Sequence, residues 1–285
     1  MIPAGALHCP SLALWLGSPS NPVGAYQHFH FVENPSLRSQ AVAELRKAFE
    51  AAHLHAKEKY ESFVAHDLDP LPASTPTPVM GYPGCLHSTT LQAYIGEILA
   101  GILAEHTAFH GESQWRVPAF LFSAHEIIVT EMERAWRQQR PPGQIPGRTG
   151  DDCLAFKMEN GKITKLLYCE AKCTISHNAS LIANAHHALS TQELGDIIKL
   201  ATIVREAKTA ESETWFLALR ECFLRRNNPP RSNLFVYVHA QEPIQRGSWM
   251  STTQPHAKYT TTRHPLAAAE VRISDITRLI SELYH

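Results

Sequence analysis

An Asn-Gly pair at positions 160 and 161 separates two strand-like segments, "CLAFKM" and "KITKLLYCEAKCT". Asparagine and glycine adopt the positive φ angles of a two-residue β-turn more easily than other residues, so this pair between two apolar runs indicates a β-hairpin. The sequence therefore predicts antiparallel neighbouring strands over residues 153–158 and 163–173. At the open end of this hairpin, Asp152 can approach the second strand.

The second strand contains charged residues inside an otherwise apolar run. Side chains alternate between the two faces of a strand. One face of this strand is then apolar, and the other carries a carboxylate next to an ammonium group. The apolar face holds Leu167, Cys169, Ala171 and Cys173, and the other face holds Tyr168, Glu170 and Lys172.

Two carboxylates beside an ammonium group suit a divalent cation and a water. Asp152 and Glu170 can supply oxygen ligands to Mg²⁺ or Mn²⁺, and Mg²⁺ also binds substrate phosphate. Lys172 can orient a water or stabilise charge on a phosphate oxygen. These residues predict a phosphodiester-hydrolysis site. The alternative is structural: acids before a strand can form a turn, and a Glu and Lys two residues apart can lie on a solvated strand face.

The same residues resemble the metal site of the PD-(D/E)XK, or restriction-endonuclease-like, nuclease superfamily. Gly150, Asp152 and the Glu170-Ala171-Lys172 triplet match its pattern, although the proline of the family name is missing before the acid. The resemblance implies an α/β fold with a mixed central β-sheet flanked by helices. It also implies a Mg²⁺-dependent nuclease that acts on DNA.

Many members of this superfamily carry a glutamate on the helix before the hairpin. The strongest helical pattern in the chain starts at Ser88 and contains Gly96-Glu97 among small and apolar residues. The resemblance implies that Glu97 completes the catalytic and metal site. The alternative is that Glu97 marks the solvent side of an amphipathic helix.

The remaining patterns divide the chain into two parts. A helical pattern over residues 36–68 precedes a Pro-rich break, so we predict an N-terminal helical, partner-binding segment over residues 1–80 and a nuclease-like domain over residues 81–285. Ser190 and Glu193 form a capping-box pattern before a further helix. Another helix is predicted at 213–226, strands at 233–240 and 267–273, and a short helix at the C-terminus.

The order of these motifs resembles the nuclease subunits of bacterial anti-phage systems, such as the Hachiman-type effector. Net charge is −1, and the sequence has no Gly-rich phosphate loop. We therefore expect a helicase or another ATPase subunit to deliver the protein to DNA. The alternatives are a catalytically inactive scaffold that kept the nuclease fold, and an unrelated α/β enzyme with a buried Glu-Lys pair.

Arginines near the hairpin are candidates for contacts with nucleic-acid phosphates. We expect Arg148 and Arg140 to bind phosphate oxygens, because such groups neutralise the DNA backbone. The alternative is that these arginines are ordinary charges near the C-terminal end of a helix, where they favour the helix dipole.

Composition indicates where the protein acts. No run of about 18 apolar residues is free of polar breaks, so no membrane span is expected. The apolar stretch near the N-terminus is short and lacks a preceding basic residue, which predicts a cytoplasmic protein. Six cysteines without disulfide-framework spacing are expected to be reduced.

Overall fold

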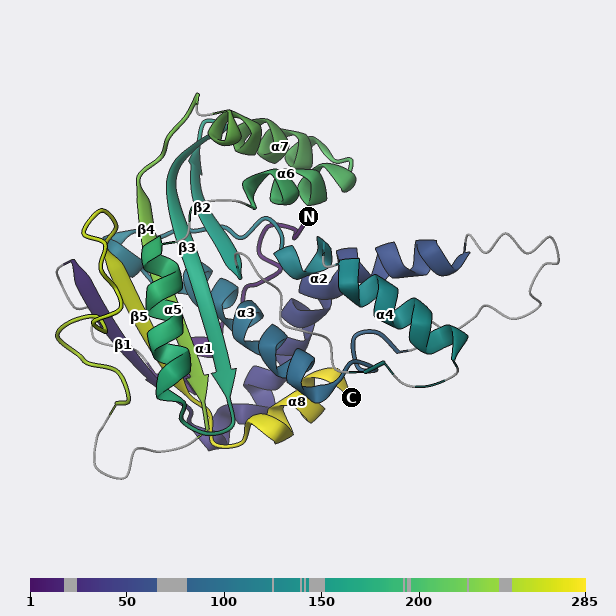
Figure 1. Ribbon diagram of the computed structural model, residues 1–285, viewed down its shortest axis with the longest axis horizontal. Coiled ribbons are helices and arrows are strands. Elements are labelled where there is room, and N and C mark those ends of the chain that lie inside the picture. Colours follow the sequence, from purple (N-terminus) through teal and green to yellow (C-terminus); the bar gives the residue numbers. More distant parts are fainter. Residues whose placement is uncertain are drawn as a thin grey trace.

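A five-stranded mixed β-sheet forms the centre of the fold (Figure 1). The strand order is β1-β5-β4-β3-β2, and all neighbouring strands are parallel except β2, which is antiparallel to β3. The strands are β1 (Tyr26–Val32), β2 (Cys153–Glu159), β3 (Lys162–Thr174), β4 (Arg231–His239) and β5 (Leu266–Arg272). The sheet is flanked by helices on both faces, so the α/β class predicted from the sequence is confirmed.

The computed structural model describes most of the chain. The described residues are 1–17, 25–65, 81–124, 126–138, 140, 142–143, 152–191, 193, 196–224, 226–240 and 248–285. Within these ranges, none of the helices combines the length and the apolar character that crossing a lipid bilayer requires. All six cysteines are free thiols.

The predicted hairpin is confirmed. Asn160 and Gly161 form its turn with positive φ angles of 51° and 73°, which a two-residue hairpin turn requires. The strands end within one residue of their predicted limits. A register shift between Lys157 and Met158, which the sequence analysis did not predict, introduces a bulge near the turn.

One face of the sheet is covered by α3 (Ser88–His106), with α2 (Arg38–Ala65) and α8 (Ile276–Tyr284) behind it (Figure 1). Every residue of α3 from Tyr94 to Ala104 is buried, as expected of a helix enclosed by other elements. Leu167, Cys169 and Ala171 of β3 belong to the hydrophobic cluster on this face. The predicted alternation of side chains along β3 is therefore confirmed.

The opposite face of the sheet is covered by α5 (Ala179–Thr191), α6 (Ile197–Glu206) and α7 (Ala210–Phe223). The capping box predicted at Ser190 is wrong. Ser190 lies in the last turn of α5, and its hydroxyl accepts hydrogen bonds from the backbone N–H groups of Thr260 and Thr261, both at 2.9 Å. The N-cap position of α6 is occupied by Asp196.

The N-terminal part of the chain adds an edge strand to the sheet. Strand β1 pairs in parallel with β5, and the sequence analysis did not predict this strand. The predicted domain boundary lies at the end of the range 66–80. This range lies outside the described residues. On either side of that range, α2 and α3 contribute to one hydrophobic cluster.

The shorter helices complete the described fold. Helix α4 lies on the side of α3 away from the sheet in the view of Figure 1. Its bounds and those of the other short elements are α1 (Leu12–Trp15), α4 (Glu126–Arg137) and the 3₁₀ turns Pro35–Leu37, Phe109–Gly111 and Leu121–Ala124.

Candidate functional site

The candidate site lies where β2 separates from β3. Strand β2 begins at Cys153, which pairs with Cys169, whereas β3 continues to Thr174 beside β4. Asp152 directs its carboxylate to this open edge, and its Oδ2 accepts a hydrogen bond of 2.8 Å from the backbone N–H of Ala171. A side chain therefore takes the place of the missing strand partner and fixes the carboxylate beside Glu-Ala-Lys.

The ammonium group of Lys172 lies between the two predicted carboxylates. Its Nζ is 2.5 Å from Glu170 Oε1 and 3.6 Å from Asp152 Oδ2. It also donates a hydrogen bond of 3.0 Å to the carbonyl oxygen of Ala171, which holds it at the open edge of β3. The predicted proximity of Asp152, Glu170 and Lys172 is thus present in the structure.

Both carboxylates of the site are buried. Asp152 is 8% exposed and Glu170 is 6% exposed. Burial by itself lowers the pKa of Lys172, but the charges of Asp152 and Glu170 outweigh it and raise this pKa above its ordinary value. Lys172 therefore stays protonated at neutral pH. In this protonated form it can donate hydrogen bonds and supply positive charge.

Glu97 of α3 lies in the interior. It is 8% exposed, so the alternative that it marks the solvent side of the helix is wrong. A Cβ at Gly96 would lie 3.2 Å from Cys173 Cβ, so the absence of a side chain there lets α3 approach β3 closely. The Glu97 carboxylate is near enough to contribute to the raised pKa of Lys172.

Asp152 and Glu170 are the two acids that could hold a small divalent cation. In this structure the point on which their carboxylates converge is the ammonium group of Lys172, since an oxygen of each lies within 3.6 Å of its Nζ. Mg²⁺ is commonly bound by one or two carboxylates and keeps several waters. Among the described residues, no three His, Cys, Asp or Glu side chains are grouped so that they could hold an ion by themselves.

The predicted phosphate-binding arginines are placed only in part. Arg148 lies outside the described residues, as do Gly150 and Asp151. Arg140 forms an ion pair of 2.9 Å with Glu131 of α4, and Glu131 also accepts a hydrogen bond from the backbone N–H of Gly143. These contacts tie Arg140 to α4, and its contact with DNA stays a prediction.

A second buried acid, which the sequence analysis missed, lies on β5. Glu270 is fully buried and lies 3.0 Å from His239 Nε2 and 3.5 Å from His28 Nε2. Burial alone would raise its pKa, but hydrogen bonds, first among them that from His239, hold the pKa below its usual range. The signal was an acid inside the apolar segment "AAAEVRI", the same pattern that singled out Glu170.

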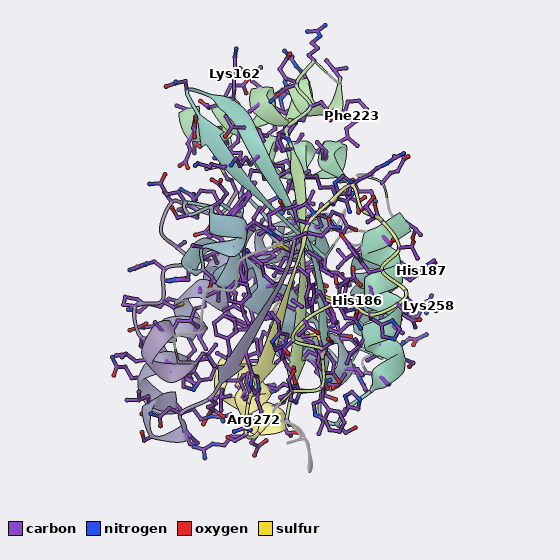
Figure 2. The ribbon with its side chains drawn as sticks, turned by 90° about the vertical axis from the view of Figure 1, so that its left-hand side faces the viewer. Lys162, His186, His187, Phe223, Lys258 and Arg272 are labelled. Atoms are coloured by element: carbon purple, nitrogen blue, oxygen red, sulfur yellow. The ribbon has the colours of Figure 1, made fainter. Side chains whose placement is uncertain are left out.

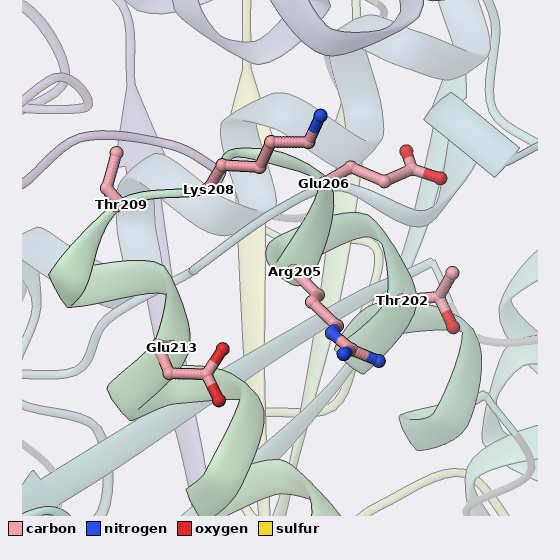
Figure 3. Close-up of a pocket in the computed structure, with 6 residues that line it drawn as sticks. All are labelled: Thr202, Arg205, Glu206, Lys208, Thr209 and Glu213. Atoms are coloured by element: carbon pink, nitrogen blue, oxygen red, sulfur yellow. The ribbon is translucent and has the colours of Figure 1, made fainter.

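A surface hollow of about 580 Å³ lies between α6 and α7 (Figure 3). It contains none of the predicted site residues. Helix α7 lies near the hairpin turn, since the side chain of Thr214 is close to Gly161. This hollow is therefore at the opposite end of the hairpin from Asp152. It is lined by Thr202, Arg205, Glu206, Lys208, Thr209 and Glu213.

No protein-family model and no curated protein matches this chain.

Proposed function

We propose that this protein is a Mg²⁺- or Mn²⁺-dependent nuclease that hydrolyses phosphodiester bonds in DNA. The observation that carries the proposal is the convergence of Asp152, Glu170 and Lys172 at the open end of the β2–β3 hairpin. Phosphodiester hydrolysis needs hard oxygen donors for a metal ion and a positive charge near the phosphate. Asp152 and Glu170 provide the oxygen donors, and Lys172 provides the positive charge.

Each residue of the site has a separate role. Asp152 and Glu170 would hold the cation, which would polarise a phosphate oxygen as a Lewis acid. Lys172 orients the attacking water and stabilises the negative charge that develops on the phosphate. The water oxygen forms a bond to phosphorus while the bond from phosphorus to the leaving sugar oxygen breaks; the water gives up a proton to solvent, and the leaving oxygen takes a proton from solvent. Glu97 lies close enough to influence Lys172 electrostatically and is the further candidate ligand.

The assignment to a nuclease superfamily and to an anti-phage complex is part of the same proposal. The resemblance of Asp152 and Glu170-Ala171-Lys172 to PD-(D/E)XK nucleases supports it, and a mixed sheet with helices on both faces is compatible with it. We extend it to an effector nuclease of a bacterial anti-phage complex of the Hachiman type, delivered to DNA by a helicase or another ATPase. The net charge of −1 supports a requirement for such a partner.

Plasmid cleavage tests this proposal directly. Supercoiled plasmid and single-stranded DNA are incubated with Mg²⁺, Mn²⁺ or EDTA, and with the wild type, Glu170→Ala or Lys172→Ala, each alone and with candidate ATPase subunits. We expect metal-dependent cutting that falls by at least about a hundredfold in both variants, because each removes a group that stabilises the transition state.

Lys165→Ala is the matched control for this experiment. Lys165 also lies on β3 and pairs with a carboxylate, that of Glu112, but nearer the hairpin turn. This variant should cut like the wild type. Cutting that persists in EDTA or in Glu170→Ala would contradict the proposed site.

A second candidate function is that of a scaffold with a nuclease fold. The short distance between Lys172 Nζ and Glu170 Oε1, 2.5 Å, favours it, because an ion pair that neutralises a buried carboxylate also has a structural use. Titration calorimetry with Mn²⁺ separates the two functions. A nuclease should bind the ion and lose this binding in Glu170→Ala, whereas a scaffold should bind DNA or its partner without any response to metal.

A further inference from the structure

A row of side chains connects the candidate site to the buried acid on β5. In the sheet, Lys172 pairs with Tyr237 of β4, and Tyr237 pairs with Glu270 of β5. Residues paired in this way point to the same face, and neighbouring strands lie about 4.8 Å apart. Tyr237 is therefore one strand away from Lys172, on the face covered by α5.

Glu270 fixes a short segment of the chain over this row. Its carboxylate accepts hydrogen bonds from the backbone N–H groups of Trp249, at 2.8 Å, and Met250, at 3.3 Å, and from the hydroxyl of Ser248. These bonds join the segment 248–250 to the middle of the sheet. The indole of Trp249 packs against the hydrophobic cluster to which Tyr237 belongs.

Tyr237 holds the loop that follows β3 next to the segment 248–250. Its hydroxyl accepts a hydrogen bond of 2.9 Å from the backbone N–H of Asn178 and lies 3.4 Å from His177 Nδ1. His177 and Asn178 lie in the loop after β3, separated by two residues from its end at Thr174. The imidazole of His177 stacks on the indole of Trp249, with ring centres 3.7 Å apart and an angle of 9° between the planes.

The stacked pair is held firmly and yet is partly exposed. A tryptophan in this position can simply cover the hydrophobic cluster below it, against which Trp249 packs. That role does not need a second flat ring aligned with it from another loop. Flat aromatic rings at a nucleic-acid site stack on unpaired bases of any sequence, because every base has a π-face.

We propose that the stack of His177 and Trp249 is a platform that binds an unpaired base of the strand whose phosphate lies at Lys172. This inference rests on the proposed nuclease function and specifies its substrate as a strand with at least one unstacked base. Bases inside a duplex are covered on both faces by their neighbours, so a platform of flat side chains can accept only a base that has left the stack. Tyr237, which contacts His177, is one strand away from Lys172.

Fluorescence anisotropy with a labelled oligothymidylate, in EDTA to prevent cutting, tests the platform. We expect Trp249→Ala to bind this single strand about tenfold more weakly than the wild type, in line with the loss of one stacked base. Trp249→Phe should retain most of the affinity, since phenylalanine keeps a flat ring. Binding to a blunt duplex of the same length should be equal for all three proteins.

Phe223→Ala is the matched control. Phe223 is 50% exposed, and it lies at the opposite end of the molecule from Arg272, which follows Glu270 on β5 (Figure 2). Removing this aromatic ring should leave binding of the single strand unchanged. An equal loss in Phe223→Ala and Trp249→Ala would contradict a specific platform.

An oligonucleotide with abasic sites provides a test that does not depend on how the variants fold. The wild type should bind the abasic strand about tenfold more weakly than oligothymidylate, and Trp249→Ala should bind both strands equally. If the wild type binds the two strands alike, or binds no single strand, the platform is wrong.

Failure of the platform can be distinguished from failure of the nuclease. Metal-dependent plasmid cutting together with indifference to abasic sites would reject the platform alone. Preferential binding of oligothymidylate without any metal-dependent cutting would reject the nuclease and keep a single-strand-binding protein.

Discussion

Asp152 combines a structural contact with a chemical one. Its Oδ2 accepts the Ala171 N–H and also lies 3.6 Å from Lys172 Nζ. The first contact needs an acceptor oxygen, whereas the second and any cation binding need negative charge. The two contributions can therefore be separated by substitution at this one residue.

Asp152→Asn and Asp152→Ala should differ in stability and agree in activity. Asparagine retains an oxygen for the Ala171 N–H, but alanine leaves that buried donor without this partner, at a cost of about 1–3 kcal/mol. Urea unfolding should show Asp152→Ala less stable than Asp152→Asn by this amount. Plasmid cutting should fall at least about a hundredfold in both; full activity in Asp152→Asn would show that the charge is not needed.

At the scale of elements, α3 holds the site against the sheet through close packing. Two glycines on this helix allow the approach of other chain segments. Gly96 faces Cys173 of β3, and a Cβ at Gly101 would lie 2.6 Å from Cζ of Phe120, whose ring is buried. Helix propensity alone would favour alanine at both positions, so glycine here reflects tertiary contacts.

Gly101→Ala should destabilise the protein. Overpacking against Phe120 costs about 1–3 kcal/mol, and the better helix propensity of alanine returns about 1 kcal/mol. A net loss of about 1 kcal/mol in the free energy of unfolding is expected by urea denaturation.

Phe120→Leu provides the check on that explanation. It removes the ring atoms that the new methyl group would meet, so the double variant should lose less stability than the two single variants together. A Gly101→Ala protein more stable than the wild type would show that the ring moves away without cost.

At the scale of the whole molecule, buried neutral histidines link folding to pH. Burial lowers the pKa of His53 to about 3 and that of His186 to about 4. Both values lie below the unfolded value of about 6.5. Below pH 6.5 the unfolded chain therefore binds more protons, and stability present at neutral pH is lost as the pH falls toward the folded values.

His186→Leu should weaken this pH dependence. Each such histidine contributes about 1.4 kcal/mol per pH unit below its unfolded pKa. Between pH 7 and pH 5, the variant should therefore lose about 2 kcal/mol less unfolding free energy than the wild type. The measurement is urea unfolding at the two pH values.

His187→Leu is the control for His186→Leu. His187 is the neighbouring, exposed histidine on α5 (Figure 2), so its loss tests whether removal of any histidine from this helix has the same result. The control should follow the wild type. Equal behaviour of the two variants would contradict a neutral, buried His186.

Local chemistry determined the features that the sequence predicted correctly. Asn160-Gly161 specified the hairpin, the two-residue period of β3 separated Ala171 from Glu170 and Lys172, and apolar spacing marked α3. In each case the turn residue or the periodic pattern lies within the segment that it shapes. The proximity of Asp152 to Glu-Ala-Lys follows from the hairpin alone.

Only the tertiary structure decided the rest. The pairing of β1 with β5, the burial of Glu97 and the position of Glu270 under the segment 248–250 depend on segments far apart in the chain. Ser190 carried a capping pattern, but its hydroxyl bonds to the backbone of Thr260 instead. The physical reason is that burial and long-range hydrogen bonds are set by which elements pack together, and no pattern within one segment records its distant neighbour.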